Sequence, residues 1–114
     1  MTIQIRGHLK ATDAIRQHID RRVTSAVGRF QERVRAVTVW LEDVNGPEKG
    51  GADKSCKIEL LLETPKHTPV VVEEVDVDMY AAISRAAERV SQAVRRDVEK
   101  LNQLDRSKSS ATAS

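Results

Sequence analysis

Residues 78–101 read DMYAAISRAAERVSQAVRRDVEKL, and this stretch decides the fold. Its apolar side chains recur at spacings of three and four, so they form one stripe of a long amphipathic helix. Four cations recur at spacings of four, seven and four, on an arc of roughly 60° nearly opposite that stripe. They are Arg85, Arg89, Arg96 and Lys100. The pattern predicts one face for a core and one for an anionic partner, although such stripes are also typical of solvated helices.

The chain before this helix begins with a strand and a second helix. Thr2–Arg6 alternates apolar and polar residues, which is typical of a short, half-buried strand. Thr12 is a favourable N-cap residue, and apolar residues at helical spacing follow it. We expect this helix to end near Glu32, with Gly28 as a weak point inside it.

Three further strands are predicted between the helices, at residues 34–43, 56–63 and 70–77. The last of them breaks its alternation at Glu73-Glu74, where a bulge would return the valines to the inner face. Residues 44–53 are rich in glycine. Because a strand and not a helix follows, they predict a hairpin loop and not a phosphate cradle. Residues 64–69 hold two prolines and predict a turn.

The order of elements predicts an α+β fold of the form β-α-β-β-β-α. A right-handed crossover makes the first two strands parallel, and two hairpins complete a four-stranded mixed sheet. Since each helix has one apolar stripe, both are expected on one face of the sheet. Asp76 or Asp78 would cap the last helix. We expect one domain over residues 1–105 and a disordered tail over 106–114, where the sequence is small and polar.

Charge is distributed unevenly along the chain of 114 residues, whose net charge is +2. Residues 13–35 hold six arginines against three acids, whereas residues 36–77 hold four lysines against nine acids.

No residues are spaced as a nucleophile with its base or as a metal site, so we expect neither an enzyme nor a cofactor. The single cysteine, Cys56, lies in a strand and is expected to be buried and inert. No apolar run is long enough for a membrane helix, which favours a soluble, cytoplasmic protein.

The arginines of the two helices are the remaining candidates for function. Arg21, Arg22 and Arg29 lie on the first helix and would face the cations of the last helix across a shared surface. Guanidinium groups contact phosphates in bidentate geometry, so two such rows would form a clamp for structured RNA. A generic interaction module is the alternative.

The motif Asp78–Ile83, DMYAAI, resembles the signature of the ribosome hibernation-promoting factors, also called ribosome-associated translation inhibitors. The resemblance extends over residues 3–102. It implies a fold similar to double-stranded RNA-binding domains. It also implies binding to the small ribosomal subunit, through the phosphate backbone of its 16S-type rRNA, in the channel for mRNA and tRNA. Family members stop translation under stress or in stationary phase by occupying that channel.

The resemblance further implies basic contact residues at matching positions: Arg16, Arg22, Arg89, Arg96 and Lys100. The dimerisation domain of the long members has no counterpart here, so we expect a monomer. We also expect the protein to bind no small molecule and no membrane. Gln92 stands where a cation is common, and the fourth strand is acidic. These departures leave open a divergent protein-interaction module with the same fold and no strong ribosome binding.

Overall fold

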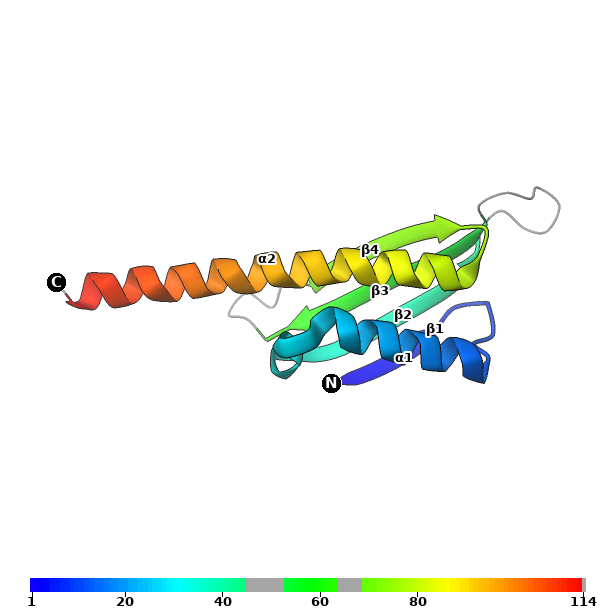
Figure 1. Cartoon of the computed structure of the whole chain (residues 1–114), viewed down its shortest axis with the longest axis horizontal. Coiled ribbons are helices and arrows are strands. Elements are labelled where there is room, and N and C mark those ends of the chain that lie inside the picture. Colours follow the sequence, from blue (N-terminus) through cyan, green and yellow to red (C-terminus); the bar gives the residue numbers. More distant parts are fainter. Residues whose placement is uncertain (45–52, 64–68, 114) are drawn as a thin grey trace.

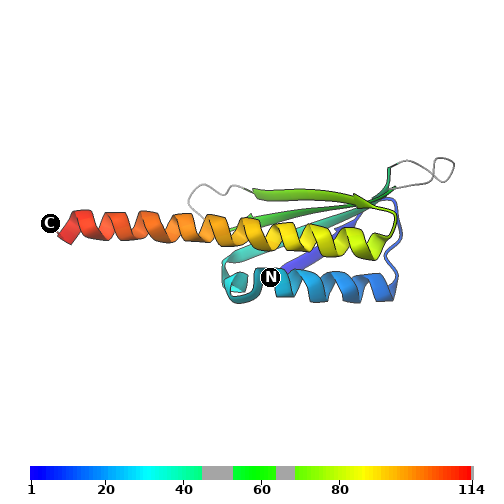
Figure 2. The same ribbon diagram turned by 45° about the horizontal axis from the view of Figure 1, so that its top comes forward.

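The computed structural model describes residues 1–44, 53–63 and 69–113, with side chains up to residue 100. Four strands form one mixed sheet in the order β1-β2-β3-β4, and two long helices lie side by side on one of its faces (Figures 1 and 2). The predicted α+β fold and its element order are therefore confirmed. The predicted loop at residues 44–53 and turn at 64–69 fall mostly outside the described residues.

The strands occupy the positions that their alternation predicts. They are β1 Thr2–Arg6, β2 Val34–Asp43, β3 Lys54–Leu62 and β4 Pro69–Asp76. β1 runs parallel to β2, as the predicted crossover requires, and the other neighbours are antiparallel. Alternate residues in the middle of β2 and β3 point under the helices and are fully buried, as Val37, Val39, Ile58 and Leu60 are. Burying these side chains is the main force that holds the helical layer to the sheet.

The first helix, α1 Asp13–Val27, begins as predicted but ends earlier. Thr12 Oγ1 accepts the backbone N–H of Ile15 at 3.2 Å, which caps the first turn. Gly28 has a φ of 48° and ends the α-helix, so the prediction of a weak point inside the helix was wrong. The 3-10 helix η1 Gly28–Arg33 continues to β2.

The predicted bulge in β4 was also wrong. The register between β3 and β4 is unbroken from Lys54–Asp76 to Leu61–Pro69, and the irregularity lies instead in β2, between Val34 and Ala36. In an unbroken strand alternate side chains share a face, so Glu74 and Asp76 follow Val70 and Val72 on the face that α2 covers.

The last helix, α2 Met79–Ala113, lies over β3 and β4 (Figure 1). Asp78 is its cap, because Oδ1 of Asp78 accepts the backbone N–H of Tyr80 at 3.1 Å. The helix continues beyond Leu101, the last residue of the predicted helix, because no glycine or proline interrupts residues 102–113. The division into a domain over 1–105 and a disordered tail over 106–114 stays a prediction.

Candidate nucleic-acid interface

Helix α2 has two different flanks beside its buried stripe. Side chains on one flank reach β4, whereas side chains on the other flank line a hollow shared with α1. Arg89 and Arg95 illustrate the division, because six residues of α-helix separate them by about 120° around the axis. The predicted cationic stripe of α2 lies on the β4 flank. The two rows of arginine therefore do not face each other as the sequence suggested.

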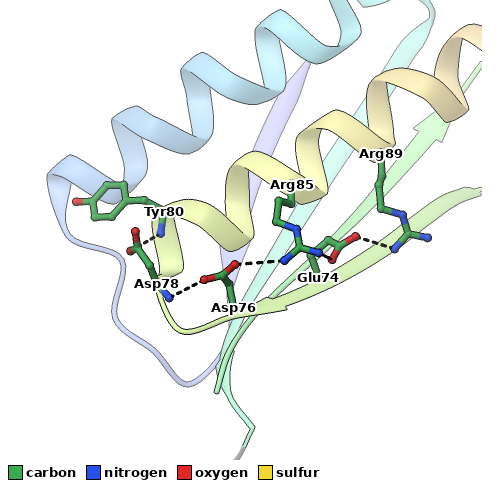
Figure 3. A network of polar contacts seen from close by, with 6 residues as sticks. All are labelled: Glu74, Asp76, Asp78, Tyr80, Arg85 and Arg89. Carbon is green, nitrogen blue, oxygen red and sulfur yellow. Dashed lines mark hydrogen bonds and ion pairs between the residues drawn. The ribbon is translucent and has the colours of Figure 1, made fainter. Parts of the chain in front are cut away.

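The flank toward β4 carries a network of four charged side chains (Figure 3). Arg85 lies 3.3 Å from Glu74 and 3.2 Å from Asp76. Arg89 lies 3.3 Å from the other oxygen of Glu74, and it donates to the backbone carbonyl of Glu73 at 3.0 Å. Two predicted RNA contacts are thus already engaged with carboxylates of the same chain.

The two carboxylates are well shielded, whereas their partners are not. The side chains of Glu74 and Asp76 are 17% and 22% exposed, against 59% for Arg85 and 52% for Arg89. The backbone N–H of Asp78 and the guanidinium of Arg85 hold the pKa of Asp76 below its ordinary value. Asp76 therefore remains charged at neutral pH and offsets the charge of Arg85.

The flank toward α1 forms a groove between the helices, the interhelical groove. One of its hollows is lined by Arg22, Ser25, Ala26, Ser84, Ala87, Glu88 and Ser91. A larger hollow of about 450 Å³ shares Ser25, Ala26 and Ser91 with the first and adds Arg29 and Arg95. Among the predicted contacts, only Arg22 and Arg29 belong to this groove.

Arg95 is the residue that the sequence reasoning missed. It lies four residues after Ser91 and eleven after Ser84, so these three share one flank of α2. The sequence contained this spacing. However, nothing in it indicated which flank of α2 would lie beside α1.

His18 ties the two helices together near the start of α2. Its Nε2 lies 3.2 Å from the carbonyl oxygen of Tyr80 and 3.1 Å from Oγ of Ser84, and its ring meets the Tyr80 ring edge-on at 5.1 Å. This contact fixes the distance between the helices at one end of the interhelical groove. The arginines at the other end are thereby held by rigid elements.

The other predicted contacts are exposed but scattered. Arg16 donates to the carbonyl of Ala11 at 3.3 Å, near the start of α1. Arg21 lines a shallow hollow with Asp20 on the outer side of α1. Arg96 and Lys100 continue the stripe on the β4 flank, and within the described residues neither has an ion-pair partner.

The described surface carries charged side chains, but no group of side chains on it is arranged for metal binding or nucleophilic chemistry. In that part of the chain, no group of three His, Cys, Asp or Glu side chains is placed to hold a metal ion. Cys56 is fully buried, and burial raises the pKa of its thiol to about 12. None of the described helices is long and apolar enough to span a bilayer. Exposed guanidinium groups on rigid helices are suited to binding phosphates.

Comparisons with known proteins show the family and the fold of this chain. The family model described as sigma 54 modulation protein / S30EA ribosomal protein matches residues 2–102. The N-terminal domain of Protein Y from Thermus thermophilus is 31% identical, with a TM-score of 0.66, over 84% of this chain and 98% of that one. A ribosomal subunit interface protein from Coxiella burnetii is 11% identical, with a TM-score of 0.69, over 87% and 99% of the two chains, and shows the shared fold alone. The comparison with curated proteins finds no match.

Proposed function

Because the chain belongs to the sigma 54 modulation protein / S30EA ribosomal protein family, we propose that it is a ribosome-binding hibernation factor. It binds the rRNA backbone of the small subunit and occupies the channel for mRNA and tRNA under stress or in stationary phase. Its output is blockage of that channel and not catalysis. It acts in the cytoplasm, as a monomer.

The observation that carries this proposal is the set of exposed cations on two packed helices. Arg22 projects from α1, Arg29 from η1, and Arg96 and Lys100 from α2. None of these four has an ion-pair partner among the described residues, so each keeps its charge available for a phosphate. Arginine and lysine contacts to the backbone recognise the shape of structured RNA and carry no sequence information.

Co-sedimentation with vacant small subunits tests the proposal. We expect the wild-type protein to pellet with subunits at low salt and to be released as salt rises, because phosphate contacts displace counterions. The double substitution R22E/R29E should weaken binding strongly. The same charge change in R6E/K57E should have a small effect, because Arg6 and Lys57 lie on the sheet face that the helices leave open.

A divergent protein-interaction module is the second candidate, and two observations favour it. Arg85 and Arg89 are engaged within the chain, and Leu61 and Val71 are 37% and 48% exposed on the open sheet face. Under this alternative the wild-type protein does not pellet with vacant small subunits, even at low salt. That result would reject the first proposal.

A further inference from the structure

We propose that the interhelical groove is a phosphate-binding surface of this chain in addition to Arg96 and Lys100, with Arg95 as the groove's cation from α2. Glu74 and Asp76 hold Arg85 and Arg89 in ion pairs, so these two arginines are less available to a phosphate. The inference rests on the proposed function, since it names which of the helical cations meet the RNA backbone. Arg95 takes the place of the predicted α2 contacts Arg85 and Arg89, although it was not part of the predicted cationic stripe.

The charge balance differs between the two flanks of α2. On the β4 flank, the two arginines of the network pair with two carboxylates, so of the described α2 cations on that flank Arg96 and Lys100 remain unpaired. In the interhelical groove, the smaller hollow is lined by Arg22 together with Glu88, and the larger hollow is lined by Arg29 and Arg95 with no acid among its lining residues. A phosphate approaching Arg85 or Arg89 must compete with carboxylates that are already in contact. At the groove it meets cations that have no ion-pair partner in the described part of the chain.

The shape of the groove also suits a polyanionic strand. Its floor is made of small side chains, among them Ser25, Ala26 and Ser91, and these leave the hollow of about 450 Å³ between the helices. Serine hydroxyls donate hydrogen bonds to phosphate and sugar oxygens. Arg29 stacks on the Phe30 ring, 4.9 Å from its centroid, so its guanidinium is held in place beside the hollow. One RNA backbone segment would lie in the groove between α1 and α2.

The ion pairs that hold Arg85 and Arg89 reduce the affinity of this chain for RNA. Because Glu74 lies between Arg85 and Arg89, removing its charge would end the ion pair of Arg89 and leave Arg85 paired with Asp76 alone. The chain would then gain phosphate contacts that it lacks with the network intact. Glu74 and Asp76 therefore set an upper limit on the RNA affinity of this protein.

Matched substitutions on α2 test the inference, with purified vacant small subunits as the probe and salt as the variable. We expect R95Q to lower affinity about three- to tenfold at moderate salt and to reduce the salt slope by about 1. R95K should bind nearly as the wild type does, because the charge is kept. R89Q removes the same charge from the same helix and should change affinity less than about twofold.

A second pair of variants tests the role of the carboxylates. E74Q should raise affinity and steepen the salt slope. E73Q makes the same charge change on the neighbouring residue, whose side chain points to the opposite face and is exposed, and it should have a smaller effect. Thermal melts of all variants identify any loss of folding.

The outcomes separate the inference from the proposed function. If R89Q costs as much affinity as R95Q, or if neither folded variant changes binding, the groove is not a phosphate-binding surface although the function stands. Equal gains from E74Q and E73Q would show that overall charge, and not the loss of the Glu74 ion pairs with Arg85 and Arg89, controls affinity. If the wild-type protein does not bind at all, the proposed function itself fails.

Discussion

Nη1 of Arg85 lies 3.2 Å from Oδ2 of Asp76, so an ion pair joins α2 to the edge strand of the sheet. The other carboxylate oxygen, Oδ1, accepts the backbone N–H of Asp78, the residue that caps α2. One side chain thus connects the end of β4, the helix cap and the cationic flank. The backbone bond from Asp78, followed by the contact with Arg85, lowers the pKa of Asp76.

This lowered pKa predicts a dependence of stability on pH. A carboxyl group whose pKa is lower in the folded state stabilises the fold at pH above its ordinary value of 3.8. That contribution is lost as pH falls from this value through the lowered folded pKa. We expect D76N to be less stable than the wild type at pH 7, and the difference in free energy of unfolding should narrow at pH 3. Urea titrations at both pH values measure it, and a constant difference would contradict the prediction.

The cap of α2 predicts a second effect on stability. Oδ1 of Asp78 accepts the N–H of Tyr80, which otherwise has no partner within the helix. We expect D78A to reduce the free energy of unfolding by about 1 kcal/mol. D78S keeps an acceptor at the cap and should cost less. Equal losses for the two variants in urea titrations would show that the cap bond is not the cause.

Among the described residues, the two glycines with positive φ should respond differently to alanine. Gly7 has a φ of 110°, and a Cβ there would lie 2.2 Å from the carbonyl oxygen of Leu41. Gly28 has a φ of 48° and open space around the same position. G28A should therefore cost about 1–3 kcal/mol from backbone strain alone. G7A should cost more, because backbone atoms must also move, and thermal melts would rank the two.

The buried thiol predicts slow chemical modification. Burial raises the pKa of Cys56 to about 12, so very little thiolate exists at pH 8. We expect a disulfide reagent such as DTNB to react slowly with the folded protein, at a rate set by opening of the fold. In denaturing urea the same thiol should react rapidly. Fast labelling of the folded protein would contradict both the burial and the raised pKa.

The sequence predicted the fold well because its strongest patterns are local. The alternation in β2 and β3 and the helical spacing in α2 each define one buried face, and packing in the structure uses those faces. The errors lie where two conformations satisfied the same pattern. Gly28 was compatible with the helix interior and with its end, and Glu73-Glu74 was compatible with a bulge and with a straight register.

The candidate site was predicted only in part, for a different reason. Helical spacing correctly grouped Arg85 and Arg89 on one flank, but it could not name the neighbour of that flank. The neighbour is β4, whose unbroken register brings Glu74 and Asp76 beneath α2. Arg95 lies on the other flank, beside α1, and no feature of the sequence distinguished it from the other arginines of α2.

By itself the sequence determined the order of the elements, their buried faces and the presence of cations on both helices. It did so because hydrophobic periodicity reports angles around the axis of each element. Only the tertiary structure decided which arginines meet carboxylates and which line a groove. Those contacts depend on the side of α2 on which α1 and β4 lie, and no periodicity within one helix contains that information.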